Sequence, residues 1–301
     1  MNHLGSTQRA IAGLAAGLLA LGILLALPSV PAVPAGAAQT ATGYWEVAAD
    51  GGIFSFGDAS FYGSMGGTHL NEPIVGIAAT PDGKGYWLVA SDGGVFAFGD
   101  AAFYGSAATL TLRARIVGIT ATPDGQGYWL VGADGGVFTF GDAGFYGSWP
   151  SQNPQSGTPG PPWPIIALVS SPDGRGYTLA DRGGMGGYVF GDYGSCRTGP
   201  EGGPSSAVYT AVAAVAGGSG DSCWVASYDG GVFTGGNAQF YGSMGGHNLD
   251  KPIVDMALTP DGGGYWLAAS DGGIFAFGDA GFHGSMGDTA LNEPIVGIAA
   301  T

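Results

Sequence analysis

The chain has 301 residues, of which 10% are charged, and 23 acidic against 8 basic residues give it a formal net charge of −15. So few lysines and arginines argue against nucleic acid and anionic membranes as partners, because both are polyanions. The 61 glycines and 18 prolines suggest low complexity, but the aromatic residues, 12% of the chain, recur at a regular period, and we therefore expect a folded core.

The first 38 residues have the pattern of a secretory signal peptide. Arg9 precedes an apolar run over residues 11–27, and small residues at 35–37 follow a Pro/Ala-rich stretch. We expect residues 1–38 to be removed and residues 39–301 to be exported, without membrane association after cleavage. The expected location is extracellular, either free or associated with the cell wall. An uncleaved anchor is the alternative, because the apolar run approaches the length of a short membrane span.

From residue 43 onward, a unit of about 42 residues recurs six times. Its second copy contains four candidate strands, which are residues 74–80, 86–91, 95–99 and 103–105. The turns between them contain Asp-Gly or Gly-Asp, and Asp-Gly between strand-forming segments favours antiparallel hairpins. The pattern therefore predicts one four-stranded antiparallel sheet for each unit.

The segment Tyr-Trp-Leu-Val-Ala at residues 86–90 carries apolar side chains on both faces, so each sheet is expected to lie between two others. The first unit lacks its first strand, and residues 295–301 supply a matching one. We therefore predict an all-β fold, a six-bladed β-propeller of four-stranded antiparallel blades, in which the C-terminal strand closes the first blade. A β-helix or a linear stack is the alternative.

The repeat is irregular between Trp149 and Trp224. The connection after residue 148 is seven residues longer than its counterpart after residue 64, and the fourth unit has Thr178 where the others have tryptophan. The chain's two cysteines also lie here, and in an exported domain we expect a disulfide between Cys196 and Cys223, with two buried thiols as the alternative. The irregular stretch is either a degenerate region held by this bridge or a specialised binding edge.

The recurring aspartates are expected to form turns. The segment 80–87 resembles the Asp-box hairpin of sialidase-like propellers, although its glycine is displaced by one position. In that family the box is structural, and the arginine cluster of a sialidase is missing from equivalent repeat positions here. Rings of carboxylates could bind Ca²⁺, but no D-x-D-x-D-G clustering occurs. We therefore expect no metal and no other cofactor.

The connections between units carry the candidate binding residues. Their amides and carboxylates could bind sugar hydroxyls, or they could cap the crossing from one unit to the next; they are His69, Asn71, Glu72, Asn248, Asp250, Asn292 and Glu293. The sequence has no G-x-S-x-G, H-E-x-x-H or phosphate-loop motif, so it identifies no catalytic residue. A glycosidase that uses a pair of carboxylates is an alternative that the sequence leaves open.

The repeated phrase D-G-G-I-F-A-F-G-D-A-x-F-Y-G-S, followed by P-I-V-G-I-A-A-T-P-D-G-x-G-Y-W, resembles a repeat of secreted actinobacterial proteins over residues 43–301. The resemblance implies export and a propeller-like module of the kind that accompanies cell-wall hydrolases or peptidases; we expect no such partner domain in this chain. We predict a monomeric, non-enzymatic module that binds an extracellular glycan or a cell-surface protein. A propeller hydrolase or lyase acting on extracellular polysaccharide and a purely structural surface protein are the alternatives.

Overall fold

The computed structural model of the chain describes residues 43–152, 160–183, 187–192, 211–216 and 222–301. The predicted signal peptide lies outside these residues. Within them, no helix combines the length and the apolar character that a membrane span requires.

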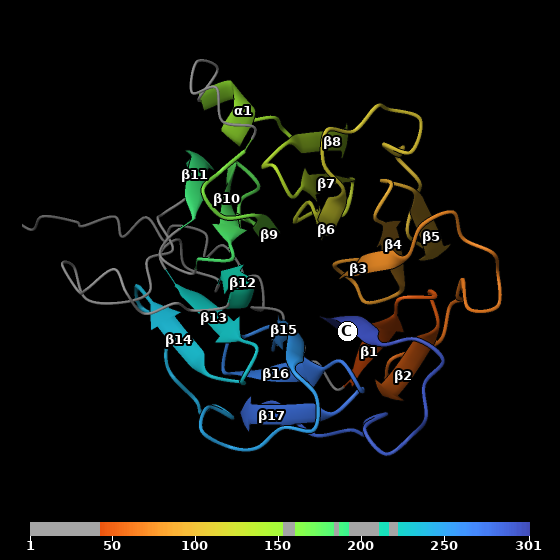
Figure 1. Cartoon of the computed structure of the whole chain (residues 1–301), viewed down its shortest axis with the longest axis vertical. Coiled ribbons are helices and arrows are strands. Elements are labelled where there is room, and N and C mark those ends of the chain that lie inside the picture. The colour runs from red at the N-terminus through yellow and green to blue at the C-terminus, as the bar shows by residue number, and fades with distance from the viewer. Residues whose placement is uncertain (1–42, 153–159, 184–186, 193–210, 217–221) are drawn as a thin grey trace, which may run out of the picture. The chain divides into compact units, whose positions relative to one another are not determined.

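The described residues form antiparallel sheets of three strands each (Figure 1). The strands in chain order are β1 (Gly43–Ala48), β2 (Ile53–Gly57), β3 (Ile74–Ala79), β4 (Gly85–Ala90), β5 (Val95–Gly99), β6 (Ile116–Ala121), β7 (Gly127–Gly132), β8 (Val137–Gly141), β9 (Ile165–Ser170), β10 (Gly176–Asp181), β11 (Tyr188–Gly191), β12 (Ala211–Ala216), β13 (Cys223–Ser227), β14 (Val232–Gly235), β15 (Ile253–Leu258), β16 (Gly264–Ala269), β17 (Ile274–Gly278) and β18 (Ile295–Ala300). A short helix, α1 (Trp149–Gln152), follows β8.

Five of these sheets are formed by consecutive strands, in the manner of β3-β4-β5, and the other has the order β18-β1-β2. The C-terminal strand β18 pairs antiparallel with β1, with Tyr44 opposite Ala300 and Glu46 opposite Ile298. This is the pairing that the two incomplete terminal units predict. It places residues from opposite ends of the described chain in one sheet.

The first strands of neighbouring sheets lie against one another (Figure 1). Strand β3 contacts β6, which contacts β9, and the same relation continues through β12 and β15 to β18. Strand β18 in turn contacts β3. The sheets therefore meet along their first strands.

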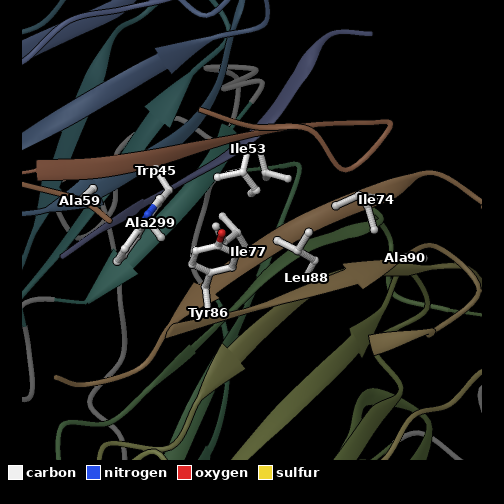
Figure 2. Packing of buried hydrophobic residues seen from close by; sticks show 10 residues of the cluster. Trp45, Ile53, Ala59, Ile74, Ile77, Tyr86, Leu88, Ala90 and Ala299 are labelled. Atoms are coloured by element: carbon white, nitrogen blue, oxygen red, sulfur yellow. The ribbon is translucent and has the colours of Figure 1, made fainter. Parts of the chain in front are cut away.

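The core lies between adjacent sheets. All six residues of β4 are buried, so both of its faces are covered, as the sequence predicts. Figure 2 shows how Trp45 and Ile53 of one sheet face Tyr86 and Leu88 of the next. The ring centroids of Trp45 and Tyr86 are 5.3 Å apart, a spacing typical of favourable aromatic pairs.

The prediction of a fourth strand is wrong in every unit whose corresponding segment the structure describes. In the second unit, residues 103–105 form no ladder with β5, and the sheets have three strands. The physical reason is that this segment, like its described counterparts, passes to the following sheet and is held there by a tyrosine side chain. Its aromatic residues and extended backbone resemble a strand in the sequence, although its hydrogen bonds are of a different kind.

We call this contact between sheets the tyrosine latch. Tyr86 Oη in β4 donates a hydrogen bond to Gly63 O (2.6 Å) in the connection after β2, and it accepts one from Tyr62 N (3.2 Å). Gly63 has φ +138°, and a Cβ atom there would lie 2.5 Å from Cδ1 of Phe98. Glycine is therefore required for the close approach between the connection and the next sheet.

The tyrosine latch recurs around the repeat. Equivalent bonds run from Tyr128 to Gly105 O (2.6 Å), from Tyr177 to Gly147 O (2.5 Å) and from Tyr265 to Gly242 O (2.5 Å). A further one joins Tyr44 Oη in β1 to Gly284 O (2.6 Å), which precedes β18. In the sheet that contains β13, Cys223 occupies the position of the latch tyrosine.

Replacing Tyr86 with phenylalanine tests the latch. The ring stays in place, but Gly63 O and Tyr62 N lose their partner, so the free energy of unfolding is expected to fall by about 1–3 kcal/mol. Urea denaturation measures the change. Tyr62→Phe is the matched control, because the hydroxyl of Tyr62 makes only a long bond of 3.3 Å to Gly83 O. An equal loss in both variants would contradict a special role for Tyr86.

Candidate functional site

The predicted binding residues lie in the connections that lead into β3, β15 and β18, and all seven are exposed; they are His69, Asn71, Glu72, Asn248, Asp250, Asn292 and Glu293. Glu72 Oε2 accepts a hydrogen bond from Ser91 Oγ (3.2 Å), just after β4. This contact fits the capping role that was the alternative for these residues. Of the predicted residues, Asp250, Asn292 and Glu293 line hollows in the surface.

The loop at residues 289–293 separates two hollows in the surface. The first, of about 250 Å³, lies between this loop and the turn that joins β16 to β17; it is lined by Ser270, Asp271, Thr289, Leu291, Asn292 and Glu293. The second, of about 270 Å³, lies between the same loop and the turn after β1, where Asp50 and Gly52 line it. The predicted residues Asn292 and Glu293 line both hollows.

A third hollow, of about 240 Å³, lies on the other side of Asp271. The predicted residue Asp250 lines it together with Lys251, Phe282 and Asp288. The hollows therefore follow one another from the connection before β15 to the turn after β1, with Asp271 and then Glu293 shared between neighbours. We call this row of hollows the groove; its sheets, β15-β16-β17 and β18-β1-β2, can be located in Figure 1.

The groove is acidic. Its carboxylates outnumber its single lysine, Lys251, and they are Asp50, Asp250, Asp271, Asp288 and Glu293. Two of them also hold turns, because Asp50 Oδ1 accepts a hydrogen bond from Gly52 N (2.9 Å) and Asp271 Oδ1 accepts one from Gly273 N (3.0 Å). The groove can thus accept hydrogen bonds from a ligand, and it disfavours anions.

A separate cavity of about 370 Å³ lies among the first strands of the sheets. Asp255 in β15 is the one carboxylate in its described lining, at the position where β3 has Gly76. Its oxygens accept hydrogen bonds from Met256 N (2.8 Å) and from Ile298 N (2.9 Å) of β18. Desolvation raises the pKa of Asp255 to about 6. The described lining presents no pair of carboxylates of the kind that a glycosidase uses.

Glu46 is not among the predicted residues; it occupies in β1 the position of Leu88 in β4. Its exposed fraction is 0%, and within the described residues neither carboxyl oxygen has a hydrogen-bond partner. The nearby amide of Met286 donates instead to Gly272 O. Burial, and then the charge of Asp271, raise the pKa of Glu46 to about 8. Its signal in the sequence is a glutamate at a position where β4, β7, β10 and β16 have leucine and β13 has valine.

The recurring aspartates form turns, as predicted. Asp82 Oδ1 accepts hydrogen bonds from Thr80 Oγ1 (3.0 Å) and Lys84 N (3.2 Å), and Gly83 has φ +68°. The hydrogen bond from Lys84 is the main cause that lowers the pKa of Asp82 to about 2. Among the residues that the structure describes, no group of three histidine, cysteine, aspartate or glutamate side chains is arranged to hold a metal ion.

The irregular stretch is only partly described. Cys223 begins β13 and is buried, whereas Cys196 lies outside the described residues, so the bridge between them stays a prediction. The hydroxyl of Thr178, which stands where other repeats have tryptophan, is buried without a hydrogen-bond partner in the described part of the chain. In the regular repeats, the indole donates to a later carbonyl, as Trp87 Nε1 does to Ala102 O (2.7 Å).

No protein-family model matches the chain, and no curated protein matches it. Among solved structures, the chain is similar to the β-propeller domain of Cps50 (Swd1) from Myceliophteria thermophila. The TM-score is 0.47 and the identity is 10%, over 86% of this chain and 82% of that one. The described residues themselves define an all-β chain of repeated three-stranded antiparallel sheets with an aromatic core between them.

Proposed function

We propose that the chain is a secreted, non-enzymatic β-propeller of six three-stranded blades, closed by β18, that binds extracellular or cell-envelope carbohydrate. Closure is supported by the pairing of β18 with β1, by the contact of β18 with β3, and by the latch from Tyr44 to Gly284. Export is supported by the signal-peptide pattern of residues 1–38.

The observation that carries the binding proposal is the groove. It gathers three of the predicted residues, Asp250, Asn292 and Glu293, from two connections that lie about 40 residues apart in the chain. Amide and carboxylate groups beside an exposed phenylalanine offer both hydrogen-bond acceptors and an apolar surface. Sugar rings carry hydroxyl groups and C–H faces, and this combination complements them. A cell-surface protein is the competing ligand.

The non-enzymatic part of the proposal is supported by the arrangement of charged groups. The cavity among the first strands has Asp255 as the one carboxylate of its described lining, and both of its oxygens already accept backbone hydrogen bonds. The carboxylates of the groove come mainly from turns and connections, where at least two of them hold the backbone.

A glycan array tests this function. The chain, purified from the medium of a secreting host and fluorescently labelled, is expected to bind a restricted set of polysaccharides, with thermal unfolding as a check that the sample is folded. N-terminal sequencing of the same sample is expected to begin near residue 39. A folded protein that binds no glycan on a broad array would contradict the proposal and favour a protein ligand or a structural role.

A further inference from the structure

We infer that the three hollows form one continuous groove for an extended oligosaccharide that is neutral or carries amines, with Phe282 as the platform on which one sugar ring stacks. This inference rests on the proposed carbohydrate binding and specifies its place and its ligand. The groove would hold several consecutive sugar units rather than a single monosaccharide.

Continuity is supported by the residues that the hollows share. Asp271 lines the hollow that contains Phe282 and also the hollow next to it. Thr289, Asn292 and Glu293 line that neighbouring hollow and also the hollow that Asp50 and Gly52 line. Each hollow has a volume of about 240–270 Å³. This is below the range of about 300–1,000 Å³ that suits a drug-sized ligand, so each hollow fits a small unit of a longer chain.

Phe282 has no part in the latch that explains its neighbours. His283 N donates a hydrogen bond to Tyr44 Oη (3.2 Å), and a Cβ atom at Gly284 would lie 2.6 Å from Phe56 Cδ1. The ring of Phe282, in contrast, is 62% exposed beside the acidic groups of its hollow. An aromatic face has partial negative charge, so it attracts the polarised C–H groups of a sugar ring and also ammonium groups.

The charges of the groove select among sugar chains. Among the described residues that line the groove, Lys251 stands against five carboxylates, Asp50, Asp250, Asp271, Asp288 and Glu293. Uronic acids, sulfated sugars and phosphate-bearing polymers would be repelled, because like charges brought together in a site oppose binding. Hydroxyl groups can donate to these carboxylates, and an amino sugar would gain a charge-assisted hydrogen bond in addition.

Isothermal titration with three hexasaccharides, of glucose, of glucosamine and of galacturonic acid, tests the charge rule in the full exported protein. We expect the neutral or the amino hexasaccharide to bind and the galacturonic acid hexasaccharide to bind at least about tenfold more weakly, which corresponds to about 1.4 kcal/mol. The corresponding trisaccharide is expected to bind more weakly than the hexasaccharide. Tightest binding of the acidic chain, or no dependence on length, would overturn the inference.

Two substitutions locate the site. Phe282→Ala and Asn292→Ala change exposed side chains, so both variants are expected to keep the unfolding temperature of the parent and to lose about tenfold or more in affinity. Phe103→Ala is the matched control: Phe103 is 61% exposed in the equivalent position of another repeat and lines none of the three hollows. The affinity of Phe103→Ala for the hexasaccharide is expected to stay within about twofold of that of the parent.

The two proposals fail in different ways. If the parent binds sugars and both groove variants keep its affinity, the groove is wrong while carbohydrate binding survives. If the folded parent binds no glycan on the broad array, carbohydrate binding itself fails, and the inference fails with it. A loss in Phe103→Ala as large as in Phe282→Ala would assign binding to the repeated phenylalanines instead of the groove.

Discussion

Replacing Glu46 with leucine is expected to raise the free energy of unfolding by about 5 kcal/mol at pH 9. The carboxyl group is completely buried without a hydrogen-bond partner among the described residues, and its pKa is raised from 4.5 to about 8. The difference between these two pKa values, multiplied by about 1.4 kcal/mol per pKa unit, gives the expected change in the free energy of unfolding. Leucine is the residue of the equivalent position in β4, β7, β10 and β16, so the space suits it.

The effect has a definite pH dependence. Because the pKa of Glu46 is higher in the folded state, its contribution to stability is fully present below pH 4.5 and is lost as the pH rises through about 8. The parent is therefore expected to become less stable across this window. The pKa of Asp255 is raised from 3.8 to about 6, so its contribution to stability also falls as the pH rises, but at lower pH. The interval from pH 6 to 8 therefore separates the effect of Glu46 from that of Asp255.

Guanidinium denaturation at pH 4, 6, 7, 8 and 9 measures this difference. Glu46→Leu is expected to remove the fall in stability between pH 6 and 8. Glu293→Gln is the control for the removal of one carboxylate as such, because this glutamate is exposed. If the parent and Glu46→Leu showed parallel profiles, Glu46 would have to be hydrated or paired in solution.

Deleting residues 295–301 is expected to abolish the folded state. The deletion removes β18, whose Ile295, Ile298 and Ala299 are buried, and leaves β1 paired with β2 alone. The deletion exposes the sheet edge next to Tyr44 and Trp45. The stabilising free energy that is lost would exceed the roughly 5–15 kcal/mol by which folded domains are stable. Near-ultraviolet circular dichroism and limited proteolysis at 25 °C measure the outcome.

A circular permutant controls for the mere shortening of the chain. Thr301 N donates a hydrogen bond to Gly43 O (3.1 Å), so a short turn can join residue 301 to residue 43. New termini are placed at Gly67, where a Cβ atom would meet nothing within 4 Å. This permutant is expected to fold with about the stability of the parent. A deletion variant that stayed folded would show that β18 is dispensable for the first sheet.

The sequence predicts most of the strands because aspartate and glycine mark their turns, and the predicted segment 95–99 coincides with β5. It fails at residues 103–105, where an aromatic, extended segment is held by the hydroxyl of Tyr128 instead of a ladder. Periodicity shows which residues are apolar, but it does not show whether the backbone finds a strand or a side chain as its partner.

The candidate site was predicted in part. Asn292, Glu293 and Asp250 belong to connections whose polar side chains stand out in the sequence, and they line the groove. Phe282 falls in the segment predicted as a fourth strand, because nothing in the repeated phrase distinguishes its exposed ring from the half-buried tyrosine that follows in most other copies. Which connections lie side by side depends on how neighbouring sheets pack, and that requires the three-dimensional structure.

The pairing of β1 with β18 has a consequence for the kinetics of folding. The hydrogen bond from Tyr44 to Gly284 joins residues 240 positions apart, and contacts of such high sequence separation form late. Until β18 arrives, the aromatic strand β1 presents an unpaired edge that can associate with other chains. Aggregation during synthesis or refolding is therefore expected to begin at the N-terminal sheet, and pairing within a newly made chain has to compete with pairing between chains.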